Sequence, residues 1–475
     1  MKVRIFHTND IHGRLDAMAR LANMIRRLRK YAEAEGWITY YWDAGDAADR
    51  RFQVFSMTKG QAVGPILEAM GCTLQTAGNA IALPYGPEAL AETARRAVYP
   101  VLAANFRNGG HPLLSGLRES VLLNLPSGQK IGVFGLTAPW GNLYETFGLH
   151  LPDFISVARA VTAKLQDAGA AAIIALSHLG LEDDRRLASE VEGIDLIVGA
   201  HSHDLLKHGE TCEGVLIAQA GEYGQCLGII DVILDEQTGQ VERKSARVKA
   251  VRADETPDPF TLEAIRRQEA IADRIKAKVV GELTADLTLD YFGECSIGSL
   301  AADVLRLRWQ AEAALISSGL FHQGLKRGAI TRGDLDSACF SSANPCMTIV
   351  DGKSIWSALE QGLDPKINRF LHHGFRGAPI GVPQISGLRV GFDAEGEPGT
   401  KVRWVEVDGE ALEPERHYKL AHTDAETLAE YGYLQLPEGH PVQQEVPTIV
   451  RETLEQYISA HSPVEQPAGG RWVAI

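Results

Sequence analysis

The chain has 475 residues, of which 45% are hydrophobic and 23% are charged, the usual mixture of a globular protein. This composition excludes a mainly disordered or collagen-like chain, and the length predicts at most three domains. The 47 basic and 61 acidic side chains give a formal net charge of −14. Because this charge repels phosphate backbones over most of the surface, we expect no nucleic-acid partner.

Short apolar runs alternate with helical patterns through the first half of the chain. Val3–Phe6 is a predicted strand, the polar segment His7–Arg14 follows it, and Leu15–Tyr31 has apolar residues at helical spacing. Further predicted strands are Trp37–Trp42, Val101–Ala104, Lys130–Leu136, Ala171–Leu176, Leu196–Val198, Val215–Ala218 and Cys226–Leu234. This alternation predicts a buried, mixed or parallel sheet with helices on both faces.

The composition changes after residue 250. Prolines and acidic residues in the segment 254–259 break regular structure, and Phe260–Lys278 then has the spacing of a charged, solvated helix. We therefore predict a first domain of residues 1–255, a linker helix within 256–278 and a second domain of residues 279–475. The elements expected in the second domain are a helix at Gly298–Arg308, strands at Ala313–Ile316 and Gly387–Phe392, and loops at Glu438–Gln444 and Pro463–Gly470.

Cysteine usage and apolar segments bear on the compartment. The six cysteines are Cys72, Cys212, Cys226, Cys295, Cys339 and Cys346. No two of them form a CxxC pair, so we expect reduced, mostly buried thiols and neither a zinc ribbon nor a dithiol redox motif. The first residues contain no apolar signal-peptide core, and no stretch reaches the roughly 18 apolar residues of a membrane helix. These features predict a soluble, cytoplasmic protein without a membrane partner.

Polar side chains recur where the predicted strands end. They are Asp10 and His12, Asp43 and Asp46, Asn79, His178, and His201 and His203. Because sites in open α/β sheets gather beyond the carboxyl ends of strands, we expect these side chains to converge. Carboxylate, imidazole and amide ligands without cysteine suit Mn²⁺, Zn²⁺, Mg²⁺ or Fe²⁺. One such cluster arises easily by chance, but five in this order predict a site for two divalent metal ions.

The clusters resemble the motifs of the bacterial 5'-nucleotidase family within the calcineurin-like metallophosphoesterases. Residues 7–13 (His-Thr-Asn-Asp-Ile-His-Gly) resemble its opening motif, Gly45-Asp46 its bridging-aspartate motif and Gly78-Asn79 its asparagine motif. Further matches are Ala103–Asn105, Ile131–Thr137, His178, Gly199–His203, Gln219–Gly224, Glu294–Asp303 and Gln384–Leu388. The resemblance implies an α/β (α+β) protein: a four-layer β-sandwich flanked by helices, followed by a smaller α/β C-terminal substrate-binding domain.

The resemblance also implies two ligand sets that share Asp46. One consists of Asp10, His12, Asp46 and His203, and the other of Asp46, Asn79, His178 and His201. From the residues alone, Asp43 is a rival for the bridge. Two cations roughly 3.5–4 Å apart can share a hydroxide and aim it at phosphorus. The expected catalytic residues here are therefore Asp46, Asn79 and His178, and Asn105 is an expected substrate contact.

The chain departs from the family at two phosphate-binding positions. The third motif normally continues from asparagine into histidine and glutamate, whereas this chain has Ala80 and Ile81. That histidine lies next to the substrate phosphate in the family, and loss of a general acid typically lowers the rate by roughly 10²–10⁴. In the second domain, His322 stands where a phosphate-binding arginine is usual. We therefore expect His322 to act as a substrate contact and surrogate acid, with Lys326 and Arg327 as further substrate contacts.

The two aromatic residues that stack on a nucleobase in the family are also missing. The corresponding positions hold Ser341-Ser342 and Ala425-Glu426. Nearby alternatives are Phe340, Phe370, Phe375 and Tyr431, although packing in the core or in loops is the simpler interpretation of each.

Two functions from different classes fit this sequence. The first is a dinuclear metal phosphoesterase that hydrolyses a small phosphomonoester, such as a nucleotide, or a cyclic phosphodiester. The second is a metal-binding pseudoenzyme that holds a phosphorylated ligand with little turnover. Loss of the motif histidine favours the second, whereas retention of every metal ligand favours the first. A phosphodiesterase acting on nucleic-acid ends is disfavoured by the net charge.

Overall fold

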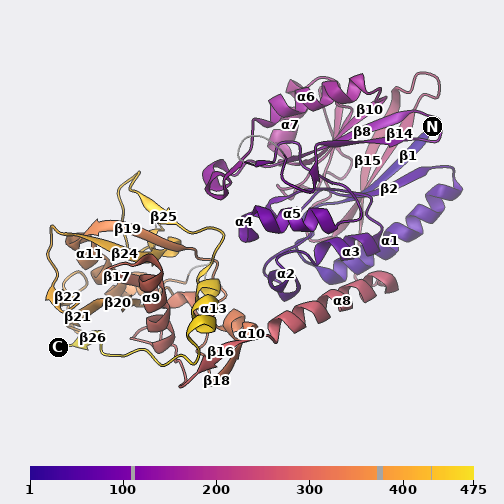
Figure 1. The fold of residues 1–475 in the computed structure, drawn as a ribbon. Coiled ribbons are helices and arrows are strands. Elements are labelled where there is room, and N and C mark those ends of the chain that lie inside the picture. Colours follow the sequence, from indigo (N-terminus) through magenta and orange to yellow (C-terminus); the bar gives the residue numbers. More distant parts are fainter. Residues whose placement is uncertain (109–112, 372–377, 429–430) are drawn as a thin grey trace. The chain divides into compact units, whose positions relative to one another are not determined.

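The computed structural model describes residues 1–108, 113–371, 378–428 and 431–475. Within these residues the chain forms two compact units, Met1–Asp273 and Arg274–Ile475 (Figure 1). Helix α8 spans Pro259–Lys276, so the division falls inside a helix whose extent agrees closely with the segment predicted as helical.

The first unit contains a seven-stranded sheet built around the N-terminal strand. Its strands are β1 (Lys2–Thr8), β2 (Ile38–Asp43), β3 (Leu74–Thr76), β4 (Val101–Leu102), β6 (Leu117–Arg118), β14 (Cys226–Leu234) and β15 (Val241–Ala250). Their order is β15-β14-β1-β2-β3-β4-β6. Strands β1, β2, β3, β4 and β6 run parallel, and β14 and β15 add an antiparallel edge beside β1.

A second, six-stranded sheet belongs to the same unit. Its strands are β7 (Ser120–Asn124), β8 (Lys130–Thr137), β10 (Ala172–His178), β11 (Leu196–Val198), β12 (Glu210–Cys212) and β13 (Val215–Ala218). They lie in the order β12-β13-β11-β10-β8-β7, with a parallel centre and antiparallel edges. A short pair, β5 (Arg107–Asn108) with β9 (Leu149–His150), lies outside both sheets.

Helices cover the outer faces of the two sheets. They are α1 (Leu15–Ala34), α2 (Gln53–Met57), α3 (Val63–Met70), α4 (Asn79–Tyr85), α5 (Pro87–Arg96), α6 (Phe154–Asp167) and α7 (Leu181–Glu190), with 3₁₀ turns η1 (Gly141–Leu143) and η2 (Glu145–Phe147). One buried apolar cluster joins the sheets, a second lies beneath α1, α3 and α5, and a third beneath α6 and α7. The implied four-layer sandwich is therefore confirmed.

The alternation of strands and helices had predicted one sheet, and this expectation is wrong because the strands divide between two. Trp42 of β2 and Ile174 of β10 share the buried layer between the sheets. Both sheets are apolar on their inner and outer faces, so strands of either one have the same continuous apolar pattern. The pattern therefore identifies buried strands but does not show which sheet they join.

The second unit packs three sheets and several helices around a separate core. Its strands are β16 (Val279–Leu283), β17 (Ala313–Ser317), β18 (Gly328–Thr331), β19 (Pro345–Asp351), β20 (Pro383–Ser386), β21 (Leu388–Phe392), β22 (Val402–Val407), β23 (Glu410–Ala411), β24 (His417–Thr423), β25 (Val442–Gln444) and β26 (Trp472–Ala474). The strand orders are β20-β17-β24-β19-β25, β23-β22-β21-β26 and β16-β18.

Helices of the second unit include the one predicted at Gly298–Arg308. The helical elements are α9 (Ser296–Trp309), α10 (Arg332–Ala338), α11 (Gly352–Leu363), α12 (Pro365–Asn368) and α13 (Val450–His461), with 3₁₀ turns η3 (Ser318–Leu320) and η5 (Asp424–Thr427). Strand β25 lies inside Glu438–Gln444, which was predicted to be a loop. Its three side chains are exposed and it pairs with β19 through the backbone, so no apolar pattern marks it.

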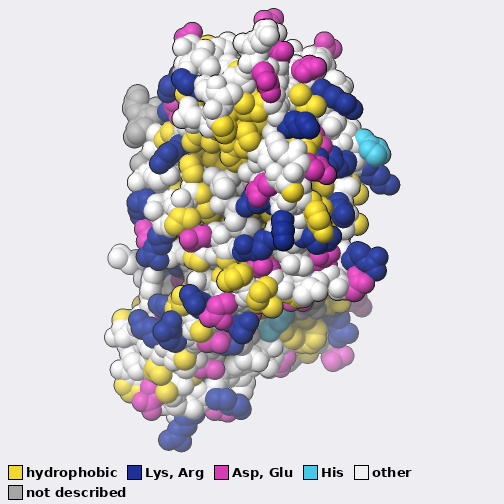
Figure 2. All heavy atoms as spheres, turned by 90° about the vertical axis from the view of Figure 1, so that its right-hand side faces the viewer, with side chains coloured by type: hydrophobic (Ala, Val, Ile, Leu, Met, Phe, Trp, Pro, Cys, Tyr) yellow, Lys and Arg dark blue, Asp and Glu magenta, His cyan; other side chains and the backbone are white. Residues whose placement is uncertain are grey.

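The described surface combines both signs of charge. Figure 2 shows Lys and Arg side chains lying among Asp and Glu side chains on one face of the molecule. All six cysteines are free thiols, and four of them are buried. None of the helices in the described ranges has both the length and the apolar character needed to cross a bilayer.

Candidate metal centre

The polar clusters found in the sequence follow strands β1, β2, β3, β10 and β11. Strand register places their ends together, because Thr8 lies opposite Asp43, and Asp43 opposite Gln75. In the other sheet, His178 at the end of β10 lies opposite Thr137 at the end of β8. The loops that leave these strand ends carry the predicted ligands, as expected for the carboxyl edge of parallel strands.

Five of the predicted ligands form two overlapping groups. The ligand atoms of Asp10, His12 and His203 lie within 4.8 Å of one another, and so do those of Asp10, Asp46 and His178. In the first group the two histidine Nε2 atoms are 3.1 Å apart. In the second, His178 Nε2 lies 3.3 Å from Asp46 Oδ2. The structure therefore brings residues from four separate loops into one centre.

The other two predicted ligands are neighbours of this centre. The His201 ring centroid lies 5.1 Å from that of His178. Asn79 is the first residue of α4, and the preceding Gly78 approaches Asp46 so closely that a Cβ there would lie 2.1 Å from Oδ1. Asn79 Oδ1 is buried, and the described residues offer it no hydrogen-bond partner. All seven predicted metal ligands thus belong to the first unit.

Each of the two carboxylates leaves one oxygen free for a ligand. Asp10 Oδ2 accepts hydrogen bonds from the His201 backbone N–H and from the Asn9 amide, both at 2.9 Å. Asp10 Oδ1 is buried and has no hydrogen-bond partner among the described residues. Asp46 Oδ1 accepts from the Ala80 N–H at 2.8 Å, which leaves Oδ2 beside His178. Because an unsatisfied buried oxygen costs about 1–3 kcal/mol, this arrangement fits a site that binds a cation.

Hydrogen bonds set the orientation of two histidines. His178 Nδ1 is 2.8 Å from the Ala44 carbonyl, which can only accept, so Nδ1 donates and the lone pair of Nε2 points toward the centre. His203 Nδ1 likewise lies 2.5 Å from Glu222 Oε2. Metal-binding histidines commonly donate their second N–H to a carbonyl or carboxylate in this way. Glu222 follows β13, so the same strand-end rule could have identified it, although its segment was noted only as a motif match.

The electrostatics of the centre favour bound positive charge. Burial raises the pKa of Asp10, and burial also lowers the pKa of His12 and of His201, the latter to about 4. Burial alone would lower the pKa of His178, but the charge and hydrogen bonding of Asp46, the charge of Asp10 and the Ala44 carbonyl together raise it to about 9. The clustered carboxylates therefore require a cation nearby. A divalent ion satisfies this requirement, and the donor set of carboxylate, imidazole and amide oxygen fits such an ion.

The loops of the centre have unusual backbone conformations. Six of the ten described non-glycine residues with positive φ lie in them, namely Asp10, His12, Asp46, His201, His203 and Tyr223. A left-handed conformation costs a non-glycine residue of the order of 1 kcal/mol or more, and such residues cluster at functional sites. Tight backbone approach contributes as well, since a Cβ at Gly45 would lie 2.6 Å from His178 Nδ1.

Asp43, the rival for the bridging position, lies outside the centre. One of its oxygens accepts from Thr8 Oγ1 at 2.8 Å, and the other from the Gln75 amide at 3.1 Å and the Gly45 N–H at 3.2 Å. Burial raises the pKa of Asp43 to about 7. With both oxygens used by the protein, Asp43 supports the loop that carries Asp46.

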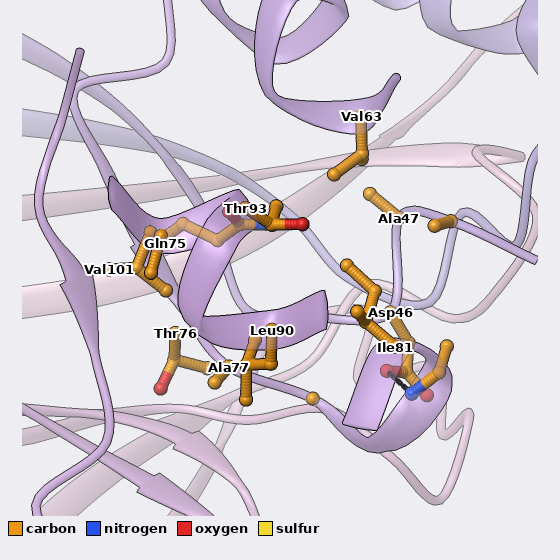
Figure 3. A pocket seen from close by; sticks show the side chains of 14 residues that line it. Asp46, Ala47, Val63, Gln75, Thr76, Ala77, Ile81, Leu90, Thr93 and Val101 are labelled. Atoms are coloured by element: carbon orange, nitrogen blue, oxygen red, sulfur yellow. Dashed lines mark hydrogen bonds between the residues drawn. The ribbon is translucent and has the colours of Figure 1, made fainter. Parts of the chain in front are cut away.

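The position of the missing motif histidine borders a small cavity. Asp46, Ala80 and Ile81 line this cavity of about 20 Å³ beneath α4, as Figure 3 shows with the hydrogen bond from the Ala80 N–H to Asp46. This volume is enough for about one water molecule. The side chains at positions 80 and 81 are aliphatic, so neither can donate a proton there.

Asn105 does not take the predicted role of a substrate contact in this structure. It is fully buried, and its amide makes two hydrogen bonds with the Thr137 backbone, at 2.7 and 2.9 Å. These bonds anchor the end of β8 and the loop that follows it. Trp140 in that loop is 39% exposed and lies edge-on to His201, with ring centroids 5.6 Å apart. Sequence reasoning missed Trp140, which has no motif around it.

The residues predicted in the second unit are exposed. The His322 ring packs against Phe340 with centroids 3.8 Å apart, and Lys326 Nζ lies 2.8 Å from Asp286 Oδ2. Arg327 carries its side chain on the same exposed turn, and its backbone N–H also binds Asp286. An exposed ion pair of this kind is weak, so a phosphate could displace Asp286 from Lys326.

The alternative aromatic residues do not form an open clamp. Phe370 and Tyr431 stack directly on each other, with centroids 3.9 Å apart and an angle of 14° between the rings. Two rings in contact leave no space for a base between them. A cavity lined by Tyr431 and Tyr433 has a volume of about 10 Å³, hardly enough for one water molecule. Phe375, the remaining alternative, lies outside the described residues.

The four-layer sandwich, with carboxylates and imidazoles at the carboxyl edge of its strands, can now be compared with known proteins. Residues 277–433 match the family model of the 5'-nucleotidase C-terminal domain. The chain is 28% identical over 433 residues to the uncharacterized metallophosphoesterase YunD of Bacillus subtilis, an alignment that covers 90% of this chain and 93% of that protein. The 5'-nucleotidase of Diplobatis ommata is 26% identical over 455 residues, with 86% and 77% of the two chains covered.

A solved structure agrees with these sequence relatives. The 5'-nucleotidase precursor of Thermus thermophilus superposes with a TM-score of 0.54 at 23% identity and covers 100% of this chain and 99% of its own. The chain is therefore similar to members of the 5'-nucleotidase family, and its residues 277–433 match the C-terminal domain of that family. These relatives are named as a metallophosphoesterase and a 5'-nucleotidase, and the chain itself holds two groups of candidate ligands for divalent metal ions.

Proposed function

We propose that this protein hydrolyses a small phosphate ester, either a nucleotide-like phosphomonoester or a cyclic phosphodiester, at a centre of two divalent metal ions. The observation that carries the proposal is the convergence of Asp10 Oδ1 and His178 Nε2, both buried without hydrogen-bond partners among the described residues, beside Asp46 Oδ2. Buried polar atoms are nearly always hydrogen-bonded, so unpaired ligand-type atoms that converge on one point favour a bound cation.

We assign the seven ligands to two ions. Asp10, His12 and His203 would hold one, and Asn79, His178 and His201 the other, with Asp46 between them. Two ions held there would supply a water of lowered pKa and neutralise charge on the phosphoryl oxygens. Asp10, and not Asp46, belongs to both observed groups. We nevertheless assign the bridge to Asp46 because of its motif. Metal analysis of Asp46→Asn and Asp10→Asn decides between the two carboxylates.

The protein's own groups orient this chemistry. The Ala44 carbonyl and Glu222 hold the rings of His178 and His203, so that each Nε2 stays directed at the centre. The Ala80 N–H holds Asp46 by one oxygen. No acidic side chain stands at position 80, so a leaving group departs unprotonated unless His322 supplies the proton. We therefore expect aryl phosphates to react faster than alkyl phosphates.

We assign catalysis to residues 1–255 and substrate binding to residues 279–475, with 256–278 as the connection. His322, Lys326 and Arg327 are the proposed contacts of the second domain, and we expect no base clamp of the family type. The closed stack of Phe370 and Tyr431 supports this last point. A small phosphate ester is the proposed substrate, and a nucleic acid or a membrane surface is not.

The alternative function is that of a metal-binding pseudoenzyme that binds a phosphorylated ligand. The alanine at position 80 favours this function, because its side chain cannot donate a proton to a leaving group. One experiment separates the two functions. Purified protein reconstituted with Mn²⁺ should contain close to two ions per chain and should hydrolyse p-nitrophenyl phosphate in a panel of phosphate esters. Two bound ions without hydrolysis of any ester would establish the pseudoenzyme.

A further inference from the structure

Arg14 lies two residues after the metal ligand His12, at the start of α1. Its half-buried guanidinium is held between two aromatic rings, with Cζ 5.0 Å from the Phe52 ring centroid and 4.5 Å from that of Tyr223. Such cation–π contacts orient a guanidinium and leave its N–H donors available at the edge.

Three loops are built to hold this aromatic sandwich. Gly13 has a φ of 74°, and a Cβ there would lie 2.6 Å from a ring carbon of Phe52, so only glycine allows Phe52 this close to the backbone. Tyr223 has a φ of 56°, and its N–H donates to the Asp10 carbonyl at 2.8 Å. The position of Arg14 is therefore tied to the loop that carries the metal ligands.

The sandwich adjoins the metal centre. The Tyr223 ring packs edge-on against His12 and His203, with centroids 6.0 and 6.1 Å away. Tyr223 thus contacts both Arg14 and two ligands of the same proposed ion. A group bound by Arg14 would lie beside a phosphoryl group at the metals and would not replace it.

Arg14 differs from the neighbouring Arg51 in its polar contacts. The neighbouring Arg51 is bound by Asp49, with two N–H groups at 2.5 and 2.8 Å from one carboxylate oxygen. Arg14 has no carboxylate or other hydrogen-bond acceptor as a partner among the residues with described positions. A half-buried guanidinium without a counter-charge, next to a centre for an anionic substrate, favours an anion as its ligand.

We propose that Arg14 binds a second phosphate of the substrate, next to the phosphate that is hydrolysed, so that the preferred substrates are compounds with a diphosphate, such as nucleoside diphosphates. The proposal rests on the function proposed above only in that the metal centre binds the first phosphate. The planar, forked N–H donors of an arginine match a phosphate group. Arg14 would thus supply a phosphate-binding arginine in the first unit, whereas position 322 of the second unit holds a histidine.

The test compares ADP with AMP in the metal-loaded protein. Equilibrium dialysis in excess Mn²⁺ gives the Kd of each nucleotide for the wild type, Arg14→Gln, Arg14→Lys and the matched control Arg20→Gln. Arg20 lies on the same helix α1, and its loss removes the same charge. We expect Arg14→Gln to weaken the binding of ADP at least tenfold more than the binding of AMP. Arg14→Lys should have an effect between those of the wild type and Arg14→Gln, and Arg20→Gln should bind both nucleotides like the wild type. Metal content and thermal unfolding of each variant confirm that the centre is intact.

Failure of this proposal is distinct from failure of the proposed function. If the wild type hydrolyses p-nitrophenyl phosphate but Arg14→Gln changes both nucleotide affinities by the same factor, the second-phosphate site is wrong and the phosphoesterase stands. Wild-type protein that binds ADP no more tightly than AMP also overturns it. If no ester is hydrolysed yet ADP binding depends selectively on Arg14, the site holds in a protein without turnover.

Discussion

Two buried carboxylates, one in each unit, differ in how their oxygens are bonded. In the first, Asp10 Oδ1 and His178 Nε2 are buried beside each other with no hydrogen-bond partner among the described residues. In the second, both oxygens of Glu426 accept hydrogen bonds, one from Ser317 and the other from Thr423. Asp10 thus keeps one oxygen available for a ligand, whereas the protein itself binds both oxygens of Glu426.

Two buried histidines show the same difference. Asp46, Asp10 and the Ala44 carbonyl together overcome the effect of burial and raise the pKa of His178. His422 in the second unit has no carboxylate against its ring, so burial lowers its pKa to about 4. The first histidine therefore belongs to a centre built for positive charge, and the second is a neutral part of a core. Buried polar residues alone do not reveal a site, but the charges around them do.

The largest expected effect is loss of both metal ions from Asp46→Asn, because a bridging carboxylate serves both ions. Activity should fall by more than about 10²-fold with them. Elemental analysis after reconstitution measures the occupancy. Asp43→Asn is the matched control and should retain both ions, since Asp43 makes hydrogen bonds only within the protein. If Asp10→Asn loses both ions and Asp46→Asn only one, the bridge is Asp10.

Restoring the missing acid should give the next largest effect. We expect Ala80→His to raise kcat on alkyl esters such as AMP by about ten- to a hundredfold, and on p-nitrophenyl phosphate much less, because only a poor leaving group needs a proton. Steady-state kinetics on both substrates measure this. His322→Ala is the companion variant, and a selective loss on alkyl esters would show that this histidine already serves as the acid. Equal wild-type rates on both substrates, unaffected by either change, would contradict this account of Ala80.

Glu222→Gln should weaken metal binding by about 10–100-fold, because the carboxylate no longer fixes the ring of His203. Titration calorimetry with Mn²⁺ measures the change, which should affect one ion more than the other. Glu213→Gln is the control. Glu213 is an exposed acid just before strand β13, which Glu222 follows, and it lies outside the centre. Equal affinities for Glu222→Gln and the wild type would show that the hydrogen bond is incidental.

The smallest effect concerns the second unit. The folded pKa of His422 is about 4 and its ordinary value 6.5, so the unfolded chain binds more protons between these values. Stability that is present above pH 6.5 is therefore lost as the pH falls toward 4, by about 1 kcal/mol between pH 7.5 and 5.5. Denaturant unfolding with EDTA present measures this loss, and His422→Gln should reduce it. His461→Gln, at an exposed site, should not change the slope.

Much of the architecture could be predicted from the order of residues. The strands β1, β10 and β11 and the helix α1 lie where local apolar patterns placed them, because burial imposes a period of two or 3.6 residues on each element. The ligands could be predicted for a related reason. A strand that ends at the edge of a sheet must be followed by a loop at that edge, so the polar residues after it lie where a site can form.

Tertiary structure decided which of these polar atoms remain available. Asp43 and Asp46 both follow β2, yet only Asp46 reaches the centre, because Thr8 and Gln75 from neighbouring strands occupy both oxygens of Asp43. Asn105 fits a family motif, but its amide oxygen and nitrogen are both hydrogen-bonded to the Thr137 backbone. Arg14 gains its proposed role only through Phe52 and Tyr223, residues far from it in the chain. The local sequence pattern determines at which strand end a residue lies. Contacts between distant segments determine whether other residues of the protein already bind its polar or charged atoms.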